Sequence, residues 1–216
     1  GAAALALAGA GCEGTAIDGA EAMVLRTAAR ARQAGLTIDA RVMDAGRLAF
    51  PDSTFDAAIS AFGIVLVPDA VGALAEMRRV VRRGGRIAVV TWTEPQRYEL
   101  AAALMAACDA VWPDRPRQPM PAQLRFRDHD TFAGLFSDAG LSKPEIETSE
   151  AYLEAPSAEW LAGHLAFAPG MDAMLAGLGT RRGDVIETFV EALEARFRSG
   201  PVRLGGAAFV GICKVE

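Results

Sequence analysis

The sequence predicts an α/β fold with a doubly wound, mostly parallel sheet, and two observations lead to this prediction. Short apolar segments without polar alternation recur through the first half of the chain, as in strands that are covered on both faces. Segments with apolar residues three or four positions apart separate them, as in amphipathic helices. Strands and helices that alternate with short links form a parallel sheet wrapped by helices.

The first half supplies the predicted elements in a regular order. The expected strands are 15–17, 38–43, 57–61 and 87–91, and the expected helices are 2–8, 21–34 and 70–81, with C-terminal stops at Gly35 and at Gly84–Gly85. No strand precedes helix 2–8, although a βα unit needs one and the first strand of an open sheet lies centrally. We therefore expect a strand and a tight loop upstream of Gly1.

The second half has a different texture. Residues 113–121 carry four prolines and predict a loop. The expected elements after it are a helix over 130–139 ended by Gly140, an edge strand over 145–153, helices over 157–167, 171–178 and 184–198, and a hairpin over 201–215 that bends at Gly205–Gly206. We expect these last strands to close the sheet antiparallel. The predicted parts are an α/β core over 1–112, a helical region over 113–200 with the edge strand near 145–153, and closing strands over 201–216.

Composition disfavours several classes of protein. A chain of 216 residues with 51% hydrophobic composition can bury a core of one substantial domain. The net charge is -5, and no basic stripe follows a phosphate backbone, so nucleic acid is not an expected partner. Apolar runs are too short to cross a bilayer. The three cysteines lack CxxC spacing, so we expect no disulfide framework, no metal site and a cytoplasmic location.

Two aspartates follow neighbouring predicted strands, at the edge of the sheet where ligands bind in such folds. Asp18 is suited to accept hydrogen bonds from a ribose diol. Its alternative role is to cap the helix that begins near Ala20, with Glu21 completing a capping box. Asp44 is suited to accept a hydrogen bond from an adenine amine, while Ala45 and Gly46 offer backbone groups. Its alternative role is that of a solvated turn residue.

Further motifs lie in a fixed order along the chain. They are Met23 and Leu25 in the helix after Asp18, "DAGRLAFPDSTFD" at 44–56, "SAFG" at 60–63, "EMRRVVRRGGRIAVVTW" at 76–92 and "AAFVGICKV" at 207–215. Within the second motif, Phe50, Pro51 and Asp52 are expected to fix a loop. Together these motifs resemble the class I S-adenosylmethionine-dependent methyltransferases, within them the ubiquinone/menaquinone-biosynthesis and bacterial small-molecule branch. The resemblance covers residues 1 to about 100 and the final strand.

This resemblance implies a fold, a cofactor and a set of binding residues. The fold is a Rossmann-like sheet of seven strands, and the cofactor is S-adenosylmethionine, which leaves as S-adenosylhomocysteine. The implied cofactor-binding residues are Asp18 at the ribose, Gly19, Ala20 and Met23 along the ribose and adenine, Asp44 with Ala45 and Gly46 at the adenine, Ser60, Ala61 and Phe62 near the methionine, and Gly1 as the last member of a glycine-rich loop. The implied acceptor is a small molecule with an oxygen or carbon nucleophile.

The acceptor side offers fewer candidates. An unactivated hydroxyl needs a base, and the chain has two histidines. His129 lies between two aspartates at a predicted helix start, where a solvated role is expected. His164 is the candidate base or acceptor contact, with Trp160 on the same helix face, and its alternative is a surface histidine. Trp92 follows the last core strand and either stacks on the acceptor or packs.

Two other functions compete with methyl transfer. A dinucleotide-binding oxidoreductase also places an acidic residue after its second strand. A non-catalytic or truncated methyltransferase-like protein would act as a partner domain, and a homodimer is left open. The block at 44–62 and the closing strands favour methyl transfer over both.

Overall fold

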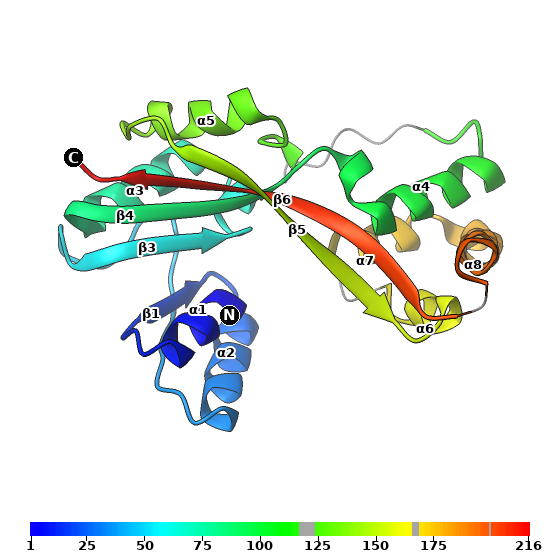
Figure 1. Cartoon of the computed structure of the whole chain (residues 1–216), viewed down its shortest axis with the longest axis horizontal. Coiled ribbons are helices and arrows are strands. Elements are labelled where there is room, and N and C mark those ends of the chain that lie inside the picture. The colour runs from blue at the N-terminus through cyan, green and yellow to red at the C-terminus, as the bar shows by residue number, and fades with distance from the viewer. Residues whose placement is uncertain (117–123, 166–168, 199) are drawn as a thin grey trace. The chain divides into compact units, whose positions relative to one another are not determined.

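A computed structural model describes residues 1–116, 124–165, 169–198 and 200–216, and they form two compact units (Figure 1). The first unit comprises residues Gly1–Thr91, Asp128–Glu147 and Val210–Glu216. The second comprises Trp92–Arg127 and Thr148–Phe209. The predicted boundaries, at residues 112 and 200, differ from the boundaries of these units. They were placed by the expected roles of the parts, and this division by role stays a prediction.

The first unit begins with a small βα layer. Its elements are α1 (Ala2–Gly9), β1 (Thr15–Asp18), α2 (Glu21–Gln33) and β2 (Asp39–Val42). Strands β1 and β2 pair in parallel, from Thr15 opposite Asp39 to Asp18 opposite Val42. Helix α2 packs on both strands, because Val24, Thr27 and Ala31 recur at helical spacing on one face and are buried.

The rest of the first unit is built around a second sheet. Its elements are β3 (Phe55–Ala61), η1 (Ile64–Leu66), α3 (Ala70–Val80), β4 (Val81–Trp92), α5 (His129–Asp138), and parts of β5 (Glu145–Ala155) and β6 (Val202–Lys214). Strands β3 and β4 are parallel. Helix α3 begins at the cap residue Asp69, whose carboxylate accepts a hydrogen bond from the Gly72 N–H at 2.8 Å. Its apolar stripe, which includes Leu74, Met77 and Val80, is buried.

The second sheet is mixed, with strand order β3-β4-β6-β5. The Gly84 N–H, early in β4, donates to the Val215 carbonyl just past the end of β6 at 2.7 Å. The Val215 N–H in turn donates to the Gly85 carbonyl at 2.9 Å. The start of β4 therefore lies beside the end of β6, and the two strands run in opposite directions.

The second unit is mainly helical. Its helices are η2 (Pro95–Arg97), α4 (Glu99–Val111), α6 (Ala158–Gly163), α7 (Pro169–Ala176), η5 (Gly179–Arg181) and α8 (Arg182–Phe197). Helix α8 packs on α4 and α6 around fully buried side chains such as Leu100, Leu104 and Phe189. Three free cysteines occur in the chain, of which Cys108 and Cys213 are buried.

The predicted α/β class and most of the elements are confirmed, and the sheet is different. The described residues form one two-stranded and one four-stranded sheet, not a single sheet of seven strands. The predicted C-terminal hairpin is wrong, because β6 runs unbroken from Val202 to Lys214. Gly205 stays in the strand, and its N–H donates to the Glu99 carboxylate at 2.7 Å. A Cβ at Gly206 would lie 3.4 Å from the Tyr98 ring, so close packing rather than a turn explains this glycine.

The Gly84–Gly85 pair was also misassigned as a helix stop. Helix α3 ends at Val80, and both glycines lie inside β4. Gly84 has a left-handed φ of 78°, and a Cβ at Gly85 would meet the Asp56 carbonyl oxygen at 2.5 Å. Gly35 and Gly140, by contrast, follow their helices with φ of 67° and 73°, as predicted.

Two predicted segments lie partly outside the described residues. The proline-rich loop at 113–121 is described up to residue 116. The helix predicted at 157–167 is shorter within its part described up to residue 165, because α6 ends at Gly163 and His164 is its C-cap residue. Within the described part of the chain, no helix has the length and apolar character that crossing a bilayer requires.

The packing of Gly85 generates a stability prediction. Gly85→Ala should lower the free energy of unfolding by about 1–3 kcal/mol, because the new methyl group has backbone oxygens of Asp56 and Arg82 as neighbours. Urea unfolding followed by circular dichroism measures the loss. The matched control is Gly134→Ala inside α5, where a Cβ meets nothing within 4 Å and alanine favours the helix. Equal stability of Gly85→Ala and the wild type would contradict the packing.

Candidate functional site

The two predicted acids lie at the carboxyl ends of adjacent parallel strands. Asp18 is the last residue of β1 and pairs with Val42, the last residue of β2. The Met43 N–H continues the ladder by donating to the Asp18 carbonyl at 3.1 Å. Asp44 follows directly, so both acids stand at the same edge of this sheet, and both side chains are exposed. This edge is where open α/β sheets bind their ligands.

Each acid holds a short turn with one of its oxygens. Asp18 Oδ1 accepts a hydrogen bond from the Ala20 N–H, and Asp44 Oδ1 accepts one from the Gly46 N–H, both at 2.9 Å. Helix α2 has Ala20 as its N-cap without a side-chain hydrogen bond, so the alternative capping box of Asp18 and Glu21 does not form. A carboxylate has about four lone-pair sites, so each acid keeps acceptor capacity for a ligand.

The remaining predicted residues of this edge lie beside the two turns. Gly19, Ala20 and Gly46 are exposed, Ala45 is half-buried, and the Met23 side chain in the first turn of α2 is 42% exposed. Gly1, the N-cap of α1, lies directly against the Thr27 side chain on α2, where a Cβ would not fit. A close approach of this kind is a recognised reason for glycine at such a position.

A third segment of predicted residues follows β3. The Ser60 hydroxyl accepts a hydrogen bond from the Ile64 N–H at 2.8 Å and so shapes the chain after the strand. Phe62 has a φ of 57°, and its N–H donates to the Val90 carbonyl of β4 at 3.1 Å. A left-handed backbone at a bulky residue is costly, and such residues cluster at functional sites. Ala61, between them, is exposed.

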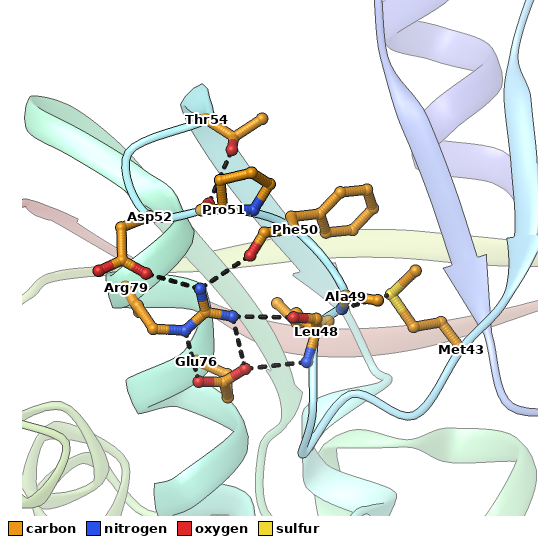
Figure 2. A network of polar contacts seen from close by, with 9 residues as sticks. All are labelled: Met43, Leu48, Ala49, Phe50, Pro51, Asp52, Thr54, Glu76 and Arg79. Atoms are coloured by element: carbon orange, nitrogen blue, oxygen red, sulfur yellow. Dashed lines mark hydrogen bonds and ion pairs between the residues drawn. The ribbon is translucent and has the colours of Figure 1, made fainter.

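The loop from Met43 to Thr54 is held by two side chains of α3, Glu76 and Arg79 (Figure 2). The Leu48 N–H donates to Glu76 Oε2 at 2.9 Å, and the Leu48 carbonyl accepts from Arg79 Nη2 at 2.8 Å. Arg79 Nη1 donates to the Phe50 carbonyl and to Asp52 Oδ1, each at 2.8 Å. The prediction that Phe50 and Asp52 fix a loop is thereby confirmed.

Glu76 and Arg79 also bind each other in a forked ion pair. Arg79 Nε donates to Glu76 Oε1 at 2.7 Å, and Nη2 donates to Oε2 at 2.8 Å. A bidentate pair of this kind is among the stronger hydrogen-bonding arrangements in proteins. The Arg79 carbonyl adds one more link, because it accepts from the Ser53 N–H at 3.0 Å.

The predicted acceptor residues lie in the second unit. The rings of Trp160 and His164 stack at a centroid distance of 4.0 Å, and His164 Nδ1 lies 2.7 Å from the Trp160 carbonyl oxygen. A carbonyl can only accept, so Nδ1 donates to it, and Nε2 is the other polar atom of the ring. Trp92 contacts the Tyr98 ring at a centroid distance of 5.2 Å. The roles of Trp92, Trp160 and His164 stay predictions.

Comparison with known proteins assigns the first part of the chain. Residues 1–89, which contain both strand-end acids and the two α3 side chains, match the family described as "Methyltransferase domain". Residues 1–89 are thus similar to a methyltransferase domain. The predicted resemblance to class I S-adenosylmethionine-dependent methyltransferases is thus confirmed.

Curated relatives match parts of the chain. An uncharacterized protein of Mycobacterium tuberculosis is 44% identical over 71 residues, 33% of this chain and 26% of the relative. A phosphatidylethanolamine N-methyltransferase of Cereibacter sphaeroides is 36% identical over 90 residues, 41% and 44% of the two chains. The ubiquinone/menaquinone biosynthesis C-methyltransferase UbiE of a Caulobacter species is 34% identical over 115 residues, 49% and 46%. These alignments span less than half of each relative.

A solved structure shares the fold at low sequence identity. The YcgJ protein of Bacillus subtilis aligns with a TM-score of 0.53 and 18% identity, over 94% of this chain and 83% of that protein. This similarity supports the α/β fold and carries no argument about substrates.

The ion pair between Glu76 and Arg79 shifts the pKa values of both groups. The Arg79 guanidinium, and to a smaller extent the Leu48 N–H, lower the pKa of Glu76 to about 2. The Glu76 and Asp52 carboxylates raise the pKa of Arg79. This contact was not predicted from the sequence. The available signal was the i, i+3 spacing of Glu76 and Arg79 together with an aspartate in the preceding loop.

The lowered pKa of Glu76 predicts an acid-dependent loss of stability. The unfolded carboxyl binds its proton at a higher pH than the folded one, so its stabilisation is complete above about pH 4.5 and is lost as pH falls toward about 2. Between about pH 6 and pH 3, the wild type should therefore lose more free energy of unfolding than Glu76→Gln. Urea unfolding at both pH values measures this difference.

The control for this experiment is Glu13→Gln. Glu13 is an exposed acid before β1, and its removal should leave the acid-dependent loss at the wild-type size. An equal loss in the wild type and in Glu76→Gln would show that Glu76 is not held in its charged form by Arg79.

Proposed function

We propose that the protein is an S-adenosylmethionine-dependent methyltransferase that acts on a small-molecule acceptor with an oxygen or carbon nucleophile. One observation carries the proposal: two exposed acids, Asp18 and Asp44, stand at the tips of adjacent parallel strands within a methyltransferase domain. Each tip has a turn that fixes one carboxylate oxygen and leaves the other for a ligand. Two such acceptors suit the ribose diol and the adenine amine of one nucleoside.

The residues of this edge fit the cofactor by their chemistry. Asp18 would accept from the ribose hydroxyls, with Gly19 and Ala20 leaving space for the sugar because neither carries a large side chain. Met23 would contact the adenine with an adaptable apolar side chain. Asp44 would accept from the adenine amine, and the backbone of Ala45 and Gly46 would line the ring. S-adenosylmethionine, when bound, supplies an electrophilic methyl group on a sulfonium.

The chain's own contribution to the reaction is alignment and exclusion of water. Methyl transfer is an in-line displacement, so the acceptor atom has to be held about 3 Å from the methyl carbon and in line with the sulfur. A positive charge disappears in the reaction, which favours a site of low polarity. The segment Ser60–Phe62, with its fixed backbone, would face the methionine part of the cofactor.

The candidate acceptor residues belong to the second unit. An acceptor hydroxyl has to lose its proton, and His164 presents Nε2 as a base because Nδ1 donates to the Trp160 carbonyl. Trp160 and Trp92 offer aromatic surface for an acceptor, and the Trp160 side chain is 45% exposed. We propose His164 as base or acceptor contact and the two tryptophans as acceptor contacts.

The relatives support methyl transfer, but they do not support a single class of acceptor. Those with named activities transfer methyl groups to nitrogen in one case and to carbon in the other. Both of these relatives are methyltransferases. The carbon acceptor of UbiE agrees with a role of this chain in biosynthesis. The free cysteines agree with a reducing, cytoplasmic location.

The role of Asp18 can be tested by ligand binding. Calorimetry with S-adenosylhomocysteine on the full-length protein should show binding, and Asp18→Ala should weaken it at least about tenfold, because the ribose diol loses its charged acceptor. Asp18→Asn should weaken binding as well, since its amide oxygen can still hold the Ala20 turn while its NH₂ cannot accept from a hydroxyl.

The matched control is Glu13→Ala, at the opposite end of β1 from Asp18. Its affinity should stay within about twofold of the wild type, as for surface changes away from a site. Wild-type affinity in both Asp18 variants would remove the assigned role of this carboxylate. No binding of S-adenosylhomocysteine by the wild type would overturn the proposed function.

A further inference from the structure

We infer that Arg79 and Glu76 are positioning residues for nucleoside recognition: from α3 they hold the loop that carries Asp44 in its binding geometry. The inference rests on the proposed function, in which Asp44 contacts the adenine. Neither residue stands at the strand tips itself. Both act through the backbone of the loop from Met43 to Thr54 (Figure 2).

The loop has little apolar packing of its own. Of residues 43–54, all of which the structure describes, Leu48 is the single buried one. Phe50 is half-buried and packs edge-on against Phe55 at a centroid distance of 5.0 Å. A loop that buries so few side chains owes its conformation to polar contacts, because hydrophobic burial cannot select one backbone path among many.

The polar contacts of the loop converge on one guanidinium. Arg has five N–H donors in a rigid fork, and in Arg79 these donors make five hydrogen bonds. Two go to Glu76, two to the carbonyls of Leu48 and Phe50, and one to the Asp52 carboxylate. A lysine has three donors at a single point, so Arg79→Lys must lose at least two of the five contacts.

The contacts that Glu76 and Arg79 make with the loop lie within a few residues of the turn at Asp44. The turn at Asp44 is closed by the Gly46 N–H to the side chain and by the Arg47 N–H to the Asp44 carbonyl. The next residue, Leu48, has both of its backbone polar groups bound, its N–H by Glu76 and its carbonyl by Arg79. The direction in which the chain leaves the Asp44 turn is therefore set by α3.

Strand β2, which precedes the turn at Asp44, cannot hold this turn in one orientation. Its four residues include no buried one, and its exposed members are Asp39, Arg41 and Val42. The ladder to β1 fixes where β2 ends, and the turn then depends on what holds the chain after it. Loss of the hydrogen bonds from Arg79 to the loop would leave Asp44 attached to the sheet but free to change its orientation. A fixed acceptor binds better than a mobile one, because the ordering cost is removed in advance.

A double-mutant cycle tests this inference. Arg79→Lys should weaken S-adenosylhomocysteine binding at least about tenfold in calorimetry on the full-length protein. Asp44→Asn keeps the turn to Gly46, because its amide oxygen still accepts, and removes the acceptor for the adenine amine. In the Asp44→Asn background, Arg79→Lys should cost no more than about twofold, since the group that it positions no longer binds.

Arg82→Lys is the matched control. Arg82 lies three residues further along the chain, and its ion pair with Asp56 is exposed. The same substitution there should change affinity by less than about twofold, as expected for a surface ion pair. Urea unfolding of every variant separates a loss of affinity from a loss of folded protein.

The experiments distinguish a failure of the positioning role from a failure of the proposed function. If the wild type binds and Asp18→Asn weakens binding while Arg79→Lys stays within about twofold of the wild type, the positioning role is wrong and the proposed function stands. An Arg79→Lys loss of the same size in both Asp44 backgrounds would also overturn the positioning role, because independent effects add. A wild type without affinity for the ligand overturns both proposals.

Hydrogen exchange provides a test that needs no variant. In the ligand-free protein, the Leu48 amide should exchange at least about tenfold more slowly than in an unstructured peptide, because Glu76 Oε2 accepts its proton. S-adenosylhomocysteine should slow it further. Exchange of the Leu48 amide at the unstructured rate would overturn the inference even if Arg79→Lys fails to fold.

Discussion

The geometry of the candidate site depends on the guanidinium of Arg79. Three of its five hydrogen bonds tie helix α3 to two carbonyls and the Asp52 side chain of a loop that has one buried residue. The other two bind Glu76 in the same helix. This loop connects β2, in the two-stranded sheet, with β3, in the four-stranded sheet. Because β1 and β2 have no ladder to the second sheet among the described residues, polar contacts of this loop help to join the two parts of the methyltransferase domain.

The strand tips explain why such a constraint matters for function. In a parallel pair in which Asp18 lies opposite Val42, the two acids stand at one edge, and each has one oxygen bound by a backbone N–H in its own turn. The second oxygens are two further acceptors at this edge, and the position of the second one depends on the loop after Asp44. The domain match to residues 1–89 contains every residue of this arrangement. The two acids and the two α3 side chains that hold the loop are thus parts of one continuous segment.

Local sequence patterns predicted the elements that local physics determines. Helix α2, its stop at Gly35 and the strands β1 and β2 were predicted from residues within a few positions of each other. Contacts between distant residues explain the errors. Gly205 lies inside a strand because its N–H donates to Glu99, 106 positions away, and Gly85 lies in one because the Asp56 carbonyl approaches it. Arg79 was missed because its partners include backbone carbonyls, which no side-chain pattern reveals.

We propose that Asp18 and Asp44 bind one adenosine moiety between them. A crystal structure of the protein with S-adenosylhomocysteine tests it most directly. We expect ribose hydroxyls within hydrogen-bond distance of the Asp18 carboxylate and the adenine amine within hydrogen-bond distance of the Asp44 carboxylate, about 2.7–3.2 Å between heavy atoms. An ordered ligand that contacts neither carboxylate, or two acids on opposite faces of the β1–β2 sheet, would contradict it.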